Sequence, residues 1–216
     1  GEKNWATNPY PDLGREAYEN LSPEFGLGSV GAGCGAQGGT MKGGLGSASF
    51  KLSNGITVGA LVAANPAGDA TDETGRHFWA APFEVSNEFG GFAAPNGGSY
   101  AKSFKRSELF PLEDRANTTI GIVATDADLT KAQAQRLATS AHDGIARAIV
   151  PSHLPYDGDL IFASSTNELP LRDEIYDLAE ICHAASLCMA RAIARGFYNA
   201  ENLPGDPMPT YKKFNS

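Results

Sequence analysis

Residues 116–125, Ala-Asn-Thr-Thr-Ile-Gly-Ile-Val-Ala-Thr, combine the start of a strand with a candidate nucleophile. A charged, loop-like segment (106–115) precedes them, and the β-branched residues that follow predict a strand over residues 119–125. Thr118 stands at the beginning of this β-prone run. If the bond between Asn117 and Thr118 is cut, Thr118 carries both a hydroxyl nucleophile and a free α-amine. One residue then supplies the attacking group and the base for amide hydrolysis.

After this stretch, the pattern predicts an alternation of helices and strands. The spacing of apolar residues favours a helix over residues 129–149, a strand over 160–165 and a second helix over 172–198. Beyond Asn202 the tail is rich in proline and is expected to be irregular. The second helix carries small residues that suit close packing against a helix or a sheet, namely Ala184, Ala185, Ser186 and Ala190.

Before this stretch, the first half of the chain is dominated by glycine and by turn signals. Residues 1–11 are expected to form a loop, and residues 14–21 a short helix that ends before Ser22-Pro23. Residues 26–46 hold ten of the 25 glycines of the chain. Such a density predicts tight turns or close backbone approach rather than a regular element.

A hairpin and a long loop complete the first half. Two strands are expected at residues 47–52 and 56–62, because Asn54-Gly55 between them is a strong hairpin signal. Residues 66–115 are polar, rich in glycine and without periodicity, so they are expected to form a long loop that leads to Thr118. An accessible approach suits a peptide bond that is to be cut.

Composition and charge exclude several classes of partner. The formal net charge of -8 argues against binding to nucleic acid or to an anionic membrane surface, because both require basic patches. No apolar run approaches the roughly 20 residues that span a bilayer, and no leader sequence is recognised. The three cysteines are odd in number and lack metal-ligand spacing, which favours reduced core thiols in a cytoplasmic protein.

One glycine motif has a weak resemblance to a nucleotide-binding loop. Residues 26–31 match G-x-G-x-x-G, but a nucleotide fingerprint needs a strand before it and a helix after it. Here Pro23-Glu24 precedes the motif and more glycine follows, so no dinucleotide or other cofactor is expected. Lys42 is the one cation inside the glycine-rich stretch 26–46, and it is either a functional side chain or an ordinary solvated lysine.

Two polar motifs lie where strands begin or end. Asp157 and Asp159 flank a glycine just before the strand 160–165, and an i, i+2 spacing there places both carboxylates on one side. They could orient an ammonium group or share a proton, and the alternative is a solvated Asp-Gly turn. Asn65 follows the strand 56–62 and could donate to an oxyanion, the alternative being a turn residue.

The histidines give no metal-binding pattern. His142, His153 and His183 fall within or beside helical segments, His77 lies in the long loop, and none pairs with another ligand at i, i+4. No metal site is therefore expected. The chain also contains no G-x-S-x-G motif, although the sequence does not exclude a Ser-His-Asp triad assembled from distant residues.

Several motifs in order resemble those of the self-processing D-aminopeptidase and β-peptidyl aminopeptidase family. They include Gly31-Ala-Gly, the octapeptide Met41-Lys-Gly-Gly-Leu-Gly-Ser-Ala, and Val58-Gly-Ala-Leu-Val followed by Asn65. Residues 117–126, 129–131, 141–148 and 155–159 continue the series. By these motifs the chain is most similar to the branch of nylon-oligomer (6-aminohexanoate-oligomer) hydrolases. The resemblance covers the chain apart from the loop 66–115 and the tail.

The resemblance implies a fold and an assembly. Family members are precursors that cut themselves before a serine or threonine, fold as an α/β four-layer αββα sandwich of the N-terminal-nucleophile type, and assemble as tetramers. Residues 1–117 would then belong to the α-chain and residues 118–216 to the β-chain of one domain. The family precursor also has an additional N-terminal segment with an active-site tyrosine, for which these 216 residues have no counterpart. That segment of the same precursor is an expected partner.

The resemblance also implies the site. Thr118 matches the nucleophile, Asn117 the residue before the cut and Asn65 the oxyanion asparagine. Asp157 and Asp159 match the acidic pair of the nylon-oligomer branch, where the aminopeptidase branch has serine and glutamate. Lys42 matches the lysine of the aminopeptidase branch, whereas the nylon branch has its lysine slightly earlier, at the position of Thr40.

The expected activity is hydrolysis of amide bonds in short peptides or in 6-aminohexanoate-type oligomers. Three alternatives stay open. The chain could be an aminopeptidase for D-amino-acid or β-peptide substrates, or an acyltransferase that uses the same threonine, although the cleavage motif of the related ornithine acetyltransferases is absent. It could also be an inactive homologue with a binding role, in which the bond between Asn117 and Thr118 would stay intact.

Overall fold

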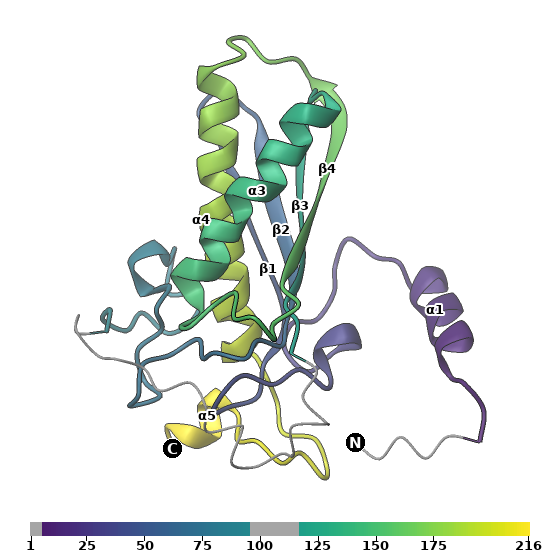
Figure 1. Cartoon of the computed structure of the whole chain (residues 1–216), viewed down its shortest axis with the longest axis vertical. Helices are drawn as coiled ribbons and strands as arrows, with labels where there is room; N and C mark the ends of the chain where they lie inside the picture. The colour runs from purple at the N-terminus through teal and green to yellow at the C-terminus, as the bar shows by residue number, and fades with distance from the viewer. Residues whose placement is uncertain (1–5, 96–116) are drawn as a thin grey trace.

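A computed structural model describes residues 6–95 and 117–216 of the chain. They form one four-stranded sheet with two long helices on one face (Figure 1). In chain order the elements are α1 (Tyr10–Glu19), the 3₁₀ turn η1 (Gly31–Gly33), β1 (Gly44–Lys51), β2 (Thr57–Ala64), the 3₁₀ turn η2 (Ala81–Phe83), β3 (Ile120–Ala127), α3 (Lys131–Ala148), β4 (Leu160–Leu169), α4 (Tyr176–Tyr198) and α5 (Tyr211–Phe214).

The sheet is mixed, and its order follows the sequence, β1-β2-β3-β4. β1 and β2 form an antiparallel hairpin, β3 pairs antiparallel with β2, and β4 runs parallel to β3. A parallel neighbour needs a crossover connection, which α3 supplies between β3 and β4. The starts of β3 and β4 and the end of β2 therefore lie at the same end of the sheet.

One face of the sheet is buried under α3 and α4. Alternate residues of the central strands point into this core, as the side-chain period of two requires, and they include Val58, Ala60, Val62 and Val123. The two helices pack on each other as well as on the sheet. The small residues predicted for close packing in α4 are all buried. α4 also lies very close to β1, since a Cβ at Gly46 would come 1.8 Å from the carbonyl oxygen of Ala192.

The opposite face of the sheet carries exposed apolar side chains. Ile120 and Ile122 of β3 are 49% and 38% exposed, and Phe162 of β4 is 61% exposed. The described residues thus form a mixed α/β unit of two layers, one of helices and one of sheet. The second sheet and second helical layer of the expected four-layer sandwich are not among the described residues.

Most predicted elements are confirmed, with shifted ends that have local causes. The hairpin at residues 47–52 and 56–62 corresponds to β1 and β2, with Asn54-Gly55 in its turn. α3 begins at Lys131 because Thr130 caps it, and the side chains of Thr130 and Gln133 form a reciprocal capping box. β4 extends to Leu169, beyond the predicted residue 165, as a polar edge strand.

Three expectations were wrong. Residues 10 and 11 belong to α1 rather than to a loop, because proline is tolerated in the first turn of a helix, where an N–H has no partner. The tail contains the short helix α5, which Thr210 caps by accepting the N–H of Lys213. Cys34 is exposed rather than a core thiol, whereas Cys188 is buried and Cys182 half-buried; all three are free.

The predicted loop 66–115 is irregular over residues 66–95, apart from η2, and its remainder lies outside the described residues.

Candidate active site

The strand period separates Thr118 from Thr119. Thr119 is fully buried on the helix-covered face, together with Gly121 and Val123. Thr118 is half-buried and shares its face with the exposed Ile120. Of the two threonines, Thr118 is therefore the one whose hydroxyl lies outside the core formed by the sheet and its helices.

Three hydrogen bonds surround the peptide bond that precedes Thr118. The Thr118 hydroxyl donates to the carbonyl oxygen of Asn117 over 2.5 Å. The backbone N–H of Gly158 donates to the same oxygen over 3.0 Å, and the N–H of Thr118 donates to the carbonyl of Asn65 over 2.9 Å. The hydroxyl thus lies beside the carbonyl that it would attack, and a second donor polarises that carbonyl.

Asn65 is placed opposite Thr118 by the antiparallel pairing of β2 and β3. Its side-chain Oδ1 accepts the N–H of Gln37 over 3.0 Å, which orients the amide group. The Nδ2 end of the side chain is then the donor that could bind an oxyanion. Gln37 belongs to the glycine-rich stretch 26–46, so that stretch serves to orient a candidate site residue.

The acidic pair lies on the other side of Thr118, at the start of β4. Asp159 Oδ1 accepts the N–H of Thr119 over 2.9 Å, and Asp157 Oδ2 accepts the N–H of Ala67 over 3.1 Å. The carboxylates are close enough to influence each other, as the i, i+2 spacing predicts. Burial raises the pKa of Asp157 to about 6. The N–H of Ala67 and the charge of His153 oppose this shift, while the negative charge of Asp159 and a hydrogen bond between the two carboxyl groups add to it.

Gly158, between the two aspartates, leaves room for the hydroxyl of Thr118. A Cβ at this position would lie 2.7 Å from Oγ1 of Thr118, closer than Cβ atoms approach other heavy atoms. The absence of a side chain and the N–H that binds the Asn117 carbonyl make Gly158 part of the site. The sequence pattern suggested only a turn role for this glycine.

Lys42 contacts the C-terminal tail rather than Thr118 or the acidic pair. Its side chain is buried and forms an ion pair with Asp206, and its N–H donates to the carbonyl of Pro209 over 2.8 Å. Partial burial of Asp206 favours the protonated acid, but the hydrogen bonds from Lys42 and from the N–H of Leu203 outweigh it and lower its pKa. Among the described residues, Lys42 makes no hydrogen bond to Thr118 or to the acidic pair. The structure therefore uses Lys42 to anchor the C-terminal tail.

Sequence reasoning missed a histidine that contacts the acidic pair. Nδ1 of His153 lies 3.1 Å from Oδ2 of Asp159, and its ring contacts that of His142 in α3 in a tilted arrangement, with 5.1 Å between the centroids. No spacing rule signals this contact, because it depends on how the loop between α3 and β4 folds back on the helix. Within the described ranges no group of three potential ligands could hold a metal ion.

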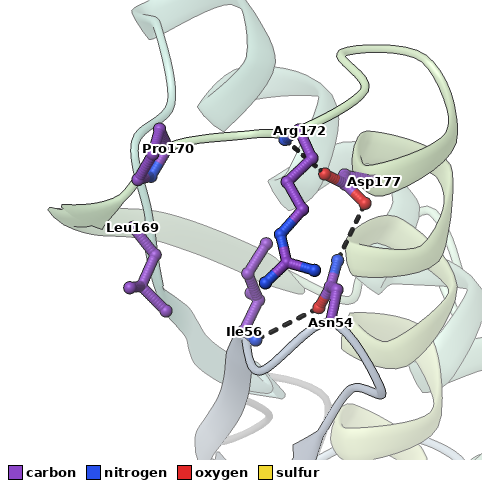
Figure 2. A pocket seen from close by; sticks show the side chains of 6 residues that line it. All are labelled: Asn54, Ile56, Leu169, Pro170, Arg172 and Asp177. Carbon is purple, nitrogen blue, oxygen red and sulfur yellow. Dashed lines mark hydrogen bonds between the residues drawn. The ribbon is translucent and has the colours of Figure 1, made fainter.

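A hollow at the far end of the sheet is separate from these residues. It lies where β4 ends, whereas Thr118 lies where β3 begins (Figures 1 and 2). Asn54 in the β1–β2 turn donates to Asp177 of α4 over 2.8 Å, and the N–H of Arg172 donates to the same carboxylate over 2.7 Å. These bonds tie the hairpin turn to the start of α4 and suit a structural role.

Comparisons with known proteins show which family the chain is similar to. The profile described as Peptidase family S58 matches residues 8–209. An uncharacterized aminopeptidase of Mycobacterium tuberculosis is 37% identical over 218 residues, covering 96% of this chain and 62% of that protein. A 6-aminohexanoate-oligomer endohydrolase of Paenarthrobacter ureafaciens is 31% identical over 180 residues, covering 77% of this chain and 48% of that protein.

A solved structure extends the likeness to the fold. The L-aminopeptidase D-Ala-esterase/amidase of Ochrobactrum anthropi, described as a variant of the Ntn hydrolase fold, matches with a TM-score of 0.61 and 26% identity. The match covers 90% of this chain and 51% of that protein. The chain thus spans 48% to 62% of the length of these relatives. None of the helices in the described part has the length and apolar content to cross a membrane.

Proposed function

We propose that this chain, which belongs to peptidase family S58, is an amidohydrolase. It first cuts its own backbone between Asn117 and Thr118, and it then uses Thr118 as an N-terminal nucleophile. The observation that carries the proposal is the pair of donors on one oxygen. The Thr118 hydroxyl and the Gly158 N–H both bind the carbonyl of Asn117, at 2.5 and 3.0 Å.

Self-cleavage proceeds in two steps. Oγ1 of Thr118 attacks the carbonyl carbon of Asn117, the C–N bond breaks, and the nitrogen of Thr118 takes up a proton to become an amine. Water then hydrolyses the ester between Asn117 and Thr118, which releases the Asn117 carboxylate and regenerates the hydroxyl. The N–H of Gly158 stabilises the negative charge that develops on the carbonyl oxygen during the first step.

The same threonine then serves the substrate. The α-amine of Thr118, whose ordinary pKa is roughly 7.7–8.0, accepts the hydroxyl proton as Oγ1 attacks a substrate amide. The carbonyl of Asn65 already accepts a hydrogen bond from this nitrogen and would hold the amine in place. Asn65 Nδ2 donates to the oxyanion, and Asp157 and Asp159 assist proton transfer to the leaving amine. Water then releases the acyl group.

The substrates we propose are short peptides or 6-aminohexanoate-type oligomers. The aspartate pair favours the second class, because it matches the nylon-oligomer branch. Lys42 stays a candidate only through its similarity to the aminopeptidase branch. An aminopeptidase for D-amino-acid or β-peptide substrates is the alternative that a panel of small amides distinguishes, and acyl transfer to an added amine tests the acyltransferase alternative.

We also propose that the exposed face of the sheet is covered in the working protein. Ile120 and Phe162, 49% and 61% exposed, lie on the face that Thr118 shares. The relatives are longer than their match to this chain. The occupant that we propose is the additional N-terminal segment of the same precursor that the family resemblance implies, followed by assembly into a homo-oligomer. Residues 1–117 and 118–216 would stay one unit after the cut, because β2 and β3 pair across it.

The experiment compares two single variants of the full-length protein by intact mass. Thr118→Ala removes the nucleophile and should leave the chain uncut and inactive. Thr119→Ala changes a buried neighbour and should still be cut, giving a new N-terminus that reads Thr-Ala-Ile-Gly. A wild-type protein that hydrolyses amides with an intact bond between Asn117 and Thr118 contradicts the proposal, and an uncut, folded and inactive wild type supports a binding role instead.

A further inference from the structure

The two aspartates beside Thr118 are held differently. Both oxygens of Asp159 have partners, since Oδ1 accepts the N–H of Thr119 over 2.9 Å and Oδ2 lies 3.1 Å from Nδ1 of His153. The backbone N–H of His153 donates to the same Oδ2 over 3.4 Å, and the Asp159 side chain is only 1% exposed. Asp159 is therefore enclosed and fixed by the protein itself.

Only one oxygen of Asp157 accepts a hydrogen bond from the described residues. Its Oδ2 accepts the N–H of Ala67, whereas its Oδ1 is buried and accepts no hydrogen bond from the described residues. A buried carboxylate oxygen without a donor favours uptake of a proton, which restores a hydrogen bond to its surroundings. The backbone of Asp157 also pairs with Asn117, the residue before the cut.

His153 is held in position by its surroundings. Its backbone has a φ of 55°, a left-handed conformation that is uncommon outside glycine, although histidine adopts it more often than most residues. Its ring lies 5.1 Å from that of His142 of α3, between centroids, in a tilted arrangement. The other described titratable groups here are Asp143, beside His142, and the pair Asp157 and Asp159. Burial lowers the pKa of His142 and the charge of His153 lowers it further, while the charges of Asp159 and Asp143 oppose this shift.

We propose that His153 is the positioning residue of the acidic pair: it binds Asp159 and fixes that carboxylate in place, so that Asp157 is the member that exchanges a proton beside Thr118. This inference rests on the proposed function, since the exchanged proton is the one needed in cleavage and hydrolysis. It assigns different tasks to two aspartates that the sequence motif treats alike.

The charge balance around the pair gives the direction of the effect. A positive charge on His153 lowers the pKa of Asp157, whereas burial and the charge of Asp159 raise it. Without the imidazole of His153, Asp159 keeps two backbone donors, the N–H of Thr119 and the N–H of residue 153. Asp157 loses the positive charge that lowers its pKa, so it would hold a proton up to a higher pH. The acid limb of the rate–pH profile should then move to higher pH.

The test separates the hydrogen bond from the backbone conformation. Asparagine and glycine both tolerate a φ of 55°, but only asparagine offers a side-chain N–H in the place of Nδ1. We expect His153→Gly to slow self-cleavage by about tenfold or more and to move its acid limb upward, since misplaced catalytic groups cost large factors in rate. His153→Asn should stay within about threefold of the wild type at pH 8, because it preserves the hydrogen bond.

A control variant and two possible results test the role of His153. His183→Gln changes an exposed histidine of α4 and should leave the profile unchanged. The rate is followed by intact mass across pH 5 to 9 in the full-length protein. Equal rates for the asparagine and glycine variants, or an unmoved acid limb in His153→Gly, overturn the inference.

A second measurement does not depend on activity. In the uncut Thr118→Ala background, nuclear magnetic resonance of ¹⁵N-labelled histidine should show a hydrogen-bonded Nδ1–H of His153 that is lost on adding Asp159→Asn. Its persistence in the double variant contradicts the contact on which the inference rests. If instead Thr118→Ala still cuts itself, the proposed function fails while this signature can remain, so the two failures are distinguishable.

Discussion

The Cβ position of Gly158 lies 2.7 Å from Oγ1 of Thr118, so the threonine hydroxyl occupies space that any side chain at residue 158 would take. Gly158 lies just before β4 and Thr118 just before β3, and the parallel register of the two strands brings them together. The space around the Thr118 hydroxyl is therefore set by a neighbouring strand as well as by its own.

We predict that Gly158→Ala slows self-cleavage by about 10²-fold, because displacement of a reacting group by about 1 Å has an effect of that size. The fold should persist, since alanine is otherwise acceptable in an extended segment. Gly59→Ala is the matched control: a Cβ there meets its nearest neighbour at 3.9 Å, an ordinary contact. Intact mass over time and circular dichroism measure both variants. Cleavage of Gly158→Ala at the control rate would mean that the crowding has no consequence.

We predict that Asn65→Asp lowers kcat for amide hydrolysis by about 10²- to 10³-fold, the cost of losing one oxyanion donor. Aspartate keeps an oxygen that can accept the N–H of Gln37, so the local structure should survive. The measurement is steady-state hydrolysis of a small amide by the full-length protein. Asn20→Asp adds the same charge at the exposed residue that follows α1 and should leave the rate unchanged. Equal rates for the two variants would remove Asn65 from the mechanism.

We predict that the effect of Asp157→Asn on the free energy of unfolding becomes more stabilising as the pH rises. The pKa of Asp157 is raised from 3.8 to about 6 in the folded chain, chiefly by burial, so the folded state holds a proton that the unfolded chain has released. This contribution to stability is complete below about pH 4 and is lost as the pH rises through about 6. Asparagine cannot ionise and avoids that loss.

Urea denaturation of Thr118→Ala with and without Asp157→Asn, at pH values from 4 to 7, measures this effect without interference from cleavage. The free energy of unfolding of the double variant, minus that of the single variant, should increase over this range. A difference that is constant with pH would mean that Asp157 titrates in the folded chain as it does in the unfolded chain.

We predict that Asp206→Asn destabilises the chain more than Lys42→Met. The Lys42 side chain is 2% exposed and that of Asp206 is 17% exposed, so removal of the carboxylate leaves the more deeply buried charge without its counter-ion. We expect about 3–5 kcal/mol for Asp206→Asn and about 1–3 kcal/mol for Lys42→Met, measured by urea denaturation. The reverse order would contradict this account. A loss of hydrolysis in Lys42→Met that Asp206→Asn does not share would support a catalytic role for Lys42.

The local pattern of the sequence was sufficient for most of the elements. Period-two alternation from residue 119 and the Asn54-Gly55 turn predicted the strands, since both are properties of neighbouring residues. The ends were less predictable, because they depend on caps such as Thr130 and on prolines in the first turn of α1. The candidate nucleophile also followed from a local feature, a hydroxyl residue at the start of a strand.

The sequence by itself determined the strand–helix order, the closely packed small face of α4 and the choice of Thr118 and the aspartate pair as candidates. Only the tertiary structure decided that His153 binds Asp159, that Gly158 crowds Thr118 and that Lys42 pairs with Asp206, 164 residues away. The physical reason is that periodicity records which face of an element is buried. Contacts between side chains of different elements depend instead on strand register and on the paths of loops, which no local pattern records.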